Sequence, residues 1–227
     1  MHPSIPAHRS IFRQKKLSIE KFRRFVVGSK QSQKAALTVE ALKKICIRLA
    51  SSRGETAARD RAIIALGFSA ALRRSELVAL DVDDLRFERK GLAVTIGRSK
   101  TDQFARGRVA GVFKASRPAY CPVAAVRDWL RIGKRKSGPL FPGSGASGRI
   151  TEASIGLIVK RCVESIGLDP KLYGAHSLRA GFVTAAAMSG VPESVIMQRT
   201  GHRSVQTVTR YVRPASVFSV DALARAL

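Results

Sequence analysis

Residues 175–212 read AHSLRAGFVTAAAMSGVPESVIMQRTGHRSVQTVTRYV. Alanine, valine and isoleucine recur here between glycine and proline residues that end helices. This pattern predicts a helix from about Ser177 to Ser189 with Gly190 as its stop, a second from Pro192 to about Thr200, and a third from Ser204 to about Val212. The stretch is therefore expected to form three consecutive helices.

Four side chains in this stretch can take part in polar chemistry: His176, Arg179, His202 and Tyr211. His176 and Arg179 are three residues apart, so on a helix they share one face and can point at the same group. His202 follows Gly201 directly, and Tyr211 comes nine residues after His202.

Two further polar patterns lie upstream. Ala71-Leu-Arg-Arg-Ser-Glu-Leu77 contains Arg73 and Glu76, and Gly97-Arg-Ser-Lys-Thr101 contains Lys100. The segments 91–97 and 109–113 are rich in β-formers, which predicts a small antiparallel sheet with Lys100 in or beside its hairpin turn.

Helices are predicted through most of the remaining chain. In the first, Thr38 is an N-cap, and Leu42, Ile45, Cys46 and Leu49 have the spacing of one buried face. The predicted helices outside the opening stretch are 38–51, 55–68, 73–80, 122–135 with Pro122 at its first position, 151–167 and 216–227. A long Gly- and Pro-rich loop is predicted over 137–148. The fold class is therefore mainly α with a small antiparallel β-sheet.

Charge is the strongest compositional signal. The chain has 41 Lys and Arg against 16 Asp and Glu, a formal net charge of +25, and 45% hydrophobic residues. A globular protein of this kind favours a polyanion, and nucleic acid is the expected partner because basic side chains release counterions condensed on phosphates. The sequence has no apolar run long enough to span a membrane and no signal peptide, so the cytoplasm is the expected location.

The cysteines and histidines indicate neither disulfides nor metal. Cys46, Cys121 and Cys162 are too few and too widely spaced for a disulfide framework or a zinc site, and the chain has only four histidines. We expect reduced thiols and chemistry that needs no metal or other cofactor.

The four polar patterns, in this order and spacing, resemble the catalytic signature of tyrosine recombinases and phage-type integrases, including the Xer-like and Cre-like enzymes. The resemblance covers about residues 36 to 213. It implies the catalytic-domain fold of the DNA breaking and rejoining enzymes, and site-specific strand exchange through a covalent 3′-phosphotyrosyl intermediate.

The resemblance also implies a role for each matching residue. Arg73 and Arg179 become the catalytic arginines, and Lys100 the lysine of the β-hairpin. His176 belongs to the His-x-x-Arg pair, and His202 to the Gly-His motif. Tyr211 becomes the nucleophile. Glu76 matches the acidic residue that supports the first arginine.

These residue types suit cleavage of a phosphodiester. The reaction needs a nucleophile, cations around the non-bridging oxygens and an acid for the leaving 5′ oxygen. Arginine stays charged and donates paired hydrogen bonds to phosphate, whereas a tyrosine phenol, with an ordinary pKa near 10, must lose its proton as it attacks. Storing the bond energy as phosphotyrosine removes the need for a nucleotide cofactor.

Each pattern alone has a simpler interpretation. Arg73 and Arg74 could form a surface ion pair with Glu76, and Lys100 could be solvated. His176 and Arg179 could cap a helix end, Gly201 and His202 could form a C-cap turn, and Tyr211 could be a packing residue. Only the joint match in order and spacing favours a catalytic site.

The ends of the chain depart from full-length members of that family. Residues 1–35 carry nine Lys or Arg and one Glu, and are expected to be a basic arm and linker, either solvated or in contact with phosphates. They are too few for the N-terminal core-binding domain that closes around DNA, so a remnant is expected there. Residues 36–227 are expected to be the catalytic domain. The apolar face of 216–227 either folds back or docks on a neighbouring protomer, building a tetramer on two DNA sites.

Two alternatives remain at this point. A type IB topoisomerase would share the mechanism but relax supercoils without pairing two sites. A truncated relative that binds DNA without cleaving it would keep the charge and lose the chemistry.

Overall fold

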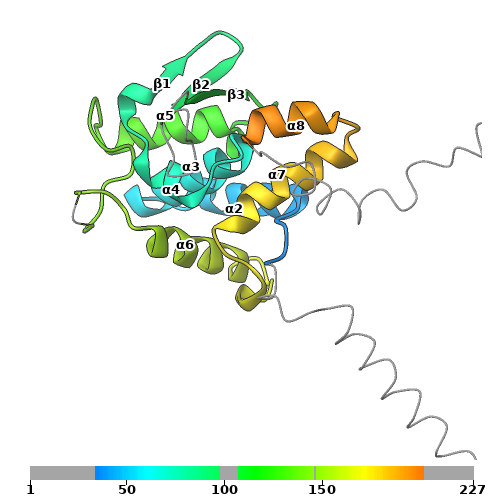
Figure 1. Cartoon of the computed structure of the whole chain (residues 1–227). Helices are drawn as coiled ribbons and strands as arrows, with labels where there is room; N and C mark the ends of the chain where they lie inside the picture. Colours follow the sequence, from blue (N-terminus) through cyan, green and yellow to red (C-terminus); the bar gives the residue numbers. More distant parts are fainter. Residues whose placement is uncertain (1–33, 98–106, 146, 202–227) are drawn as a thin grey trace, which may run out of the picture. The chain divides into compact units, whose positions relative to one another are not determined.

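The described part of the chain is mainly helical, with one three-stranded antiparallel sheet (Figure 1). This computed structural model describes residues 34–97, 107–145 and 147–201. The α-helices are α2 (Val39–Ser51), α3 (Glu55–Ser69), α4 (Arg74–Ala79), α5 (Pro122–Ile132), α6 (Glu152–Glu164), α7 (His176–Met188) and α8 (Glu193–Thr200). The strands are β1 (Leu85–Phe87), β2 (Gly91–Ile96) and β3 (Arg108–Phe113), and short 3-10 helices are η1 (Val82–Asp84), η2 (Pro118–Tyr120) and η3 (Pro170–Leu172). The predicted fold class is confirmed.

Helix α3 is the centre of the core. It is buried on nearly every side, as expected for a helix rich in Ala, Ile and Leu that packs against α2, α5 and α7. Helix α2 buries one face through Leu42, Ile45 and Cys46, and the Thr38 side chain accepts a hydrogen bond from the Ala41 backbone N–H at 3.1 Å. The predicted N-cap and buried face of this helix are therefore confirmed.

The sheet has the order β1-β2-β3 and lies along one side of the helices, whereas α6 lies along the opposite side (Figure 1). Alternate residues of β2 (Leu92, Val94 and Ile96) are buried, which matches the two-residue period of a half-buried strand. The predicted hairpin strands are confirmed. Strand β1 was not predicted, because three residues are too short to show an alternating pattern.

Helices α5 and α6 end three residues before their predicted ends. Helix α5 ends at Ile132 instead of about 135, because Lys134 adopts a left-handed conformation (φ 49°) that no α-helix continues. Helix α6 ends at Glu164, before Gly167, which has φ 82°. The arm 1–33, Lys100, and the predicted helices beyond Gly201 lie outside the described residues.

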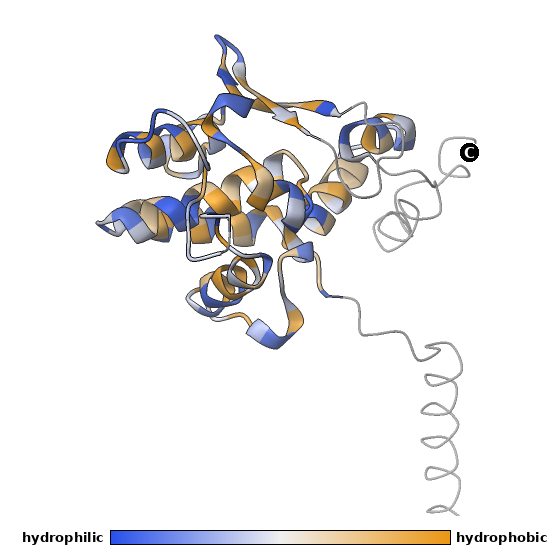
Figure 2. Ribbon diagram, turned by 60° about the vertical axis from the view of Figure 1, so that its left-hand side comes forward, coloured by the Kyte–Doolittle hydropathy of each residue, from blue (hydrophilic) through white to orange (hydrophobic). Residues whose placement is uncertain are grey.

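Helix α7 approaches the rest of the core very closely at Gly181. The hydropathy colouring in Figure 2 shows apolar faces of the helices turned toward one another. A Cβ atom at Gly181 would lie 2.2 Å from the Leu37 carbonyl oxygen and 2.6 Å from the Phe68 ring. Glycine is required for this contact, which packs the second turn of α7 against the Leu37 backbone and the Phe68 ring of α3.

The three cysteines are free, as predicted, and all three are buried. Burial raises the pKa of Cys46 and of Cys162 to about 12, so both stay protonated at neutral pH. In the described ranges, no helix has the length and apolar character needed to cross a membrane. The same ranges contain no cluster of three or more potential metal ligands among His, Cys, Asp and Glu.

Candidate active site

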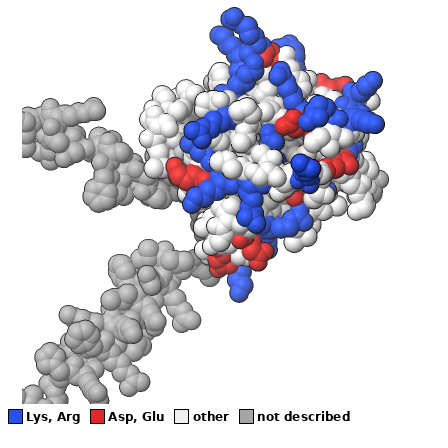
Figure 3. Space-filling view, turned by 180° about the vertical axis from the view of Figure 1, so that it is seen from behind, with Lys and Arg blue, Asp and Glu red and all other residues white. Residues whose placement is uncertain are grey.

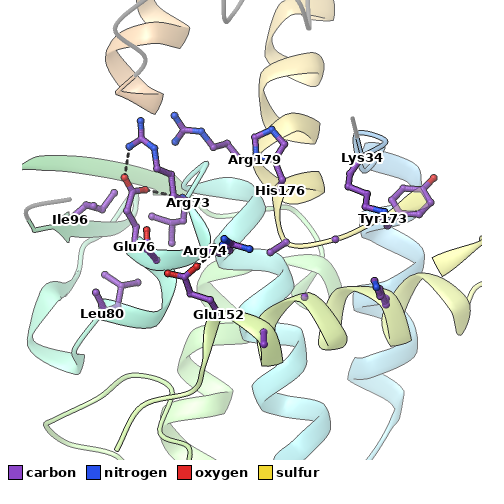
Figure 4. A pocket seen from close by; sticks show the side chains of 18 of the residues that line it. Lys34, Arg73, Arg74, Glu76, Leu80, Ile96, Glu152, Tyr173, His176 and Arg179 are labelled. Atoms are coloured by element: carbon purple, nitrogen blue, oxygen red, sulfur yellow. Dashed lines mark hydrogen bonds and ion pairs between the residues drawn. The ribbon is translucent and has the colours of Figure 1, made fainter. Parts of the chain in front are cut away.

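A cleft of about 1030 Å³ lies where α4, α6, α7 and the end of β2 meet. Four of the seven predicted site residues line it: Arg73, Glu76, His176 and Arg179. In Figure 4, Arg73, Arg179 and His176 lie next to one another, while Lys34 and Tyr173 lie farther along the cleft. Residues more than 100 positions apart in the sequence therefore face one shared space.

Arg73 is held by Glu76 through two hydrogen bonds. Arg73 is the N-cap of α4, and its backbone N–H donates to Glu76 Oε2 at 2.8 Å. Its Nη1 donates to Glu76 Oε1 at 2.6 Å. Because the Glu76 side chain is only 3% exposed, this is not the surface ion pair of the simpler interpretation. The carboxylate fixes both the start of α4 and the direction of the guanidinium.

Glu76 is ionised in this setting. Burial raises the pKa of its carboxyl, but the charge of Arg108 and the hydrogen bonds from Arg73 outweigh burial and hold the pKa below its ordinary value. Arg108 Nη2 donates to Glu76 Oε2 at 2.8 Å. Two guanidinium groups therefore share one buried carboxylate.

Arg179 is buried, with only 3% of its surface exposed, and it reaches the cleft from the first turn of α7. Its Nη1 donates to the Ala71 carbonyl oxygen at 2.8 Å, and its Nη2 to that of Thr200 at 2.6 Å. Ala71 has a φ of 52°, a left-handed conformation that costs a non-glycine residue about 1–2 kcal/mol. The charge of Arg179 is thus held in one orientation by backbone on two sides.

His176 is the first residue of α7 and lies at the cleft, where it is partly exposed to solvent. Burial and the nearby charge of Arg179 lower the pKa of its imidazole below the ordinary value. At neutral pH the ring is therefore neutral in the free protein and can act as a hydrogen-bond donor or acceptor.

A titration followed by NMR tests this state. The ring protons of His176 are assigned as the signals that are absent in His176→Asn. We expect them to titrate with a pKa below the ordinary value near 6.5. Because the neutral form is favoured in the folded protein, the stability due to His176 is present above the unfolded pKa and is lost as the pH falls. An ordinary or raised midpoint would contradict the effect of desolvation and of the Arg179 charge on this ring.

Three arginines converge on the last turn of α8. Arg108 Nη1 donates to the carbonyl oxygen of Arg199 at 2.9 Å, Arg179 Nη2 to that of Thr200, and Arg73 Nη2 to that of Gly201 at 2.9 Å. The final carbonyls of a helix lack partners within the helix and carry partial negative charge. Cations from β3, α7 and the start of α4 thus cap the end of α8.

Arg108 was not singled out in the sequence, although it belongs to this cluster. Among 41 basic residues its type carries no information. The signal that could have indicated Arg108 is its position in the alternation of buried and exposed residues along the strand. Arg108 lies two positions before the buried Ala110, so both point to the core face of β3. The predicted strand began at Val109 and left Arg108 out.

Three of the predicted site residues cannot be placed at the cleft. Lys100, His202 and Tyr211 lie outside the described residues. Gly97 lines the cleft just before the segment with Lys100, and Gly201, with a left-handed φ of 65°, ends α8 just before His202. The last described residues before Lys100 and before His202 therefore lie at the cleft and at the end of α8, respectively.

The cleft contains further basic side chains besides those of Arg73 and Arg179. Lys34 and Lys160 line it, and Arg74 Nε pairs with Glu152 on α6 at 2.5 Å. The Arg74 side chain is 64% exposed, so this pair is an ordinary surface contact. An anion that enters the cleft meets an excess of positive charge.

This fold is that of a tyrosine recombinase catalytic domain. The structure is similar to the XerH site-specific recombinase bound to difH substrate in a post-cleavage complex, with a TM-score of 0.64 and 20% identity over 85% of this chain and 57% of that one. It is also similar to the Tn1549 transposon integrase in complex with a circular intermediate DNA, with a TM-score of 0.65 and 17% identity over 96% and 77% of the two chains.

The chain belongs to the phage integrase family, which it matches over residues 36–216. It is 37% identical over 172 residues to the integrase/recombinase xerD homolog of Selenomonas ruminantium, covering 74% of this chain and 50% of that protein. It is 33% identical over 159 residues to tyrosine recombinase XerC of Thermodesulfovibrio yellowstonii, covering 69% and 50%. The matched region thus spans about half the length of these relatives.

Proposed function

We propose that the chain is a site-specific DNA recombinase that cleaves and rejoins DNA through a 3′-phosphotyrosyl intermediate on Tyr211. The observation that carries this proposal is the meeting of Arg73, Arg179 and His176 at one cleft, with Glu76 buried beneath Arg73. Two fixed guanidinium groups and a hydrogen-bonding imidazole are what the non-bridging oxygens of a reacting phosphate require.

Each residue has a defined task in this reaction. The Tyr211 phenol oxygen attacks phosphorus and loses its proton, while the bond to the 5′ oxygen breaks. Lys100 gives a proton to that leaving oxygen, and Arg73 and Arg179 stabilise the charge on the non-bridging oxygens. His176 and His202 donate further hydrogen bonds. Reversal by a 5′ hydroxyl from another strand completes exchange without a nucleotide cofactor or metal.

Double-stranded DNA is the proposed substrate. The net charge of +25 favours it, and Lys and Arg side chains cover more of the face shown in Figure 3 than Asp and Glu do. Similar solved structures include XerH bound to difH substrate and the Tn1549 integrase in complex with a circular intermediate DNA. Binding should weaken steeply as salt is added.

The proposal also assigns a role to each part of the chain. Residues 36–227 would form the catalytic domain, and the basic segment 1–35 would contact phosphates as an arm and linker. The helix expected at 216–227 would dock on a neighbouring protomer, which gives a tetramer on two DNA sites. The protein would act in the cytoplasm on the nucleoid.

A suicide-substrate assay tests the proposal. Nicked duplexes from the native genomic context are incubated with the wild type and with Tyr211→Phe in EDTA, and denaturing gels show covalent adducts. We expect an adduct with the wild type and none with Tyr211→Phe, because only the phenol oxygen can form the phosphate ester.

The other outcomes separate the alternatives. Adduct formation on any duplex, with relaxation of supercoiled plasmid, would indicate a topoisomerase. Salt-sensitive DNA binding without any adduct would indicate a non-cleaving relative. An adduct that persists in Tyr211→Phe would show that another residue is the nucleophile.

A further inference from the structure

The side chain of Arg108 joins two parts of the candidate site. It extends from the start of β3 and is only 16% exposed. One end of its fork, Nη2, donates to Glu76 Oε2 at 2.8 Å, and the other, Nη1, donates to the Arg199 carbonyl oxygen at 2.9 Å. One residue thus ties the carboxylate under Arg73 to the last turn of α8.

We propose that Arg108 is a positioning residue for the cleavage reaction: it holds Glu76, and through Glu76 the guanidinium of Arg73, in register with the end of α8. This inference rests on the proposed function, because the chain continues from α8 to His202 and Tyr211, and the strand transfer assigned to them needs Arg73 at a fixed distance from that segment. Arg108 does not line the cleft and has no assigned contact with the phosphate.

Charge gives Arg108 a second effect on the site. Glu76 alone would orient Arg73 and at the same time cancel its charge, because the two groups are 2.6 Å apart. Arg108 supplies a second positive charge on the same carboxylate, at 2.8 Å. The three groups together keep a net charge of +1, so Arg73 can be held by a carboxylate and still present a positive field to a phosphate.

The geometry requires arginine. Two acceptors on different elements, a carboxylate oxygen and a main-chain carbonyl, are reached by two separate nitrogens of one rigid plane. A lysine ammonium would keep the charge, but its compact head is a poor match for both acceptors at once. Arg108→Lys should therefore retain the electrostatic part of the effect and lose much of the positioning.

The experiment compares Arg108→Met and Arg108→Lys with the wild type and with Arg86→Met. Arg86 lies in the same sheet and pairs with Glu88 at 2.8 Å, but its side chain is 80% exposed. It is a matched control for the loss of one positive charge. Single-turnover adduct formation on the suicide substrate is measured from pH 5 to 9 with DNA in saturating excess.

Two results are expected from the adduct rates. Arg108→Met should be slower by about 100-fold, the size of effect that misplaced reacting groups produce, and Arg108→Lys should recover part of the loss. The rate of Arg108→Met should also fall off at a higher acidic pH than that of the wild type, since Glu76 would lose one of the two charges that keep it ionised. The other charged or titratable groups around the cleft are unchanged in the variants: Lys34, Arg73, Arg74, Asp84, Glu152, Lys160, Tyr173, His176 and Arg179.

Amide hydrogen exchange on the free proteins tests the physical link without any activity. In Arg108→Met, peptides covering 193–201 should exchange faster by about tenfold, because the end of α8 loses one of its three caps, and Arg86→Met should match the wild type. This readout still tests the inference if no protein forms an adduct, which would count against the proposed function alone. Unchanged exchange in α8, or an adduct rate and pH profile equal to those of Arg86→Met, would overturn the inference.

Discussion

Arg179→Met is expected to lower the rate of DNA cleavage by at least about 1000-fold. Removing a single neutral donor from a site that stabilises developing negative charge costs about 100- to 1000-fold, and a buried guanidinium supplies charge as well as hydrogen bonds. The neighbouring guanidinium groups of Arg73 and Arg108 are held by Glu76 and by main-chain carbonyl oxygens at the end of α8, so they cannot take the place of Arg179 without breaking these contacts. The measurement is single-turnover adduct formation with saturating DNA.

A folding control is required for this substitution. The two carbonyls that lose Arg179 are buried with it, and each unsatisfied group costs about 1–3 kcal/mol. Chemical denaturation of Arg179→Met therefore accompanies the assay, and rates are compared only under conditions where the variant is folded. Arg127→Met removes the same charge from an exposed position over the Phe87 ring and should cleave like the wild type. A folded Arg179→Met with the wild-type rate would remove Arg179 from the proposed chemistry.

The helices were predictable because their signals are local. Thr38 caps α2 and Thr151 caps α6 through their own side chains, and the apolar spacing of α2 matches its buried face. His176 and Arg179 could also be placed together, because a helix puts residues three apart on one face. Periodicity could not give the left-handed conformation of Ala71, whose carbonyl is fixed by Arg179 from 108 residues away.

The assembly of the site was less predictable than its parts. The sequence predicted Arg73 and Glu76 through spacing and resemblance, but nothing local reveals that Glu76 is shared with Arg108. Such a contact depends on how β3 is placed against α4, which is a property of the tertiary packing. The cap on α8 has the same origin, because its three arginines come from three separate elements.

Glu76→Gln is expected to destabilise the fold by about 3–5 kcal/mol at pH 7. Glutamine keeps the shape and its carbonyl oxygen can still accept hydrogen bonds, but its amide nitrogen cannot accept, and the negative charge is gone. Arg73 and Arg108 would then face each other across a neutral side chain in a buried site. The measurement is the free energy of unfolding by denaturant. Glu88→Gln, which removes a half-exposed partner of Arg86, should change stability by less than about 0.5 kcal/mol.

The difference in the free energy of unfolding between the wild type and Glu76→Gln should depend on pH, and this dependence identifies its cause. The pKa of Glu76 is lower in the folded chain than its ordinary value near 4.3, so the unfolded chain binds the proton more readily. The stability contributed by the carboxylate is thus fully present above the unfolded pKa and is lost as the pH falls toward the folded pKa. The difference in unfolding free energy between the wild type and Glu76→Gln should be constant from pH 6 to 8 and should decrease steadily below about pH 5. A gap that stays the same down to pH 3 would mean that packing, and not the shared charge, holds Arg73 in place.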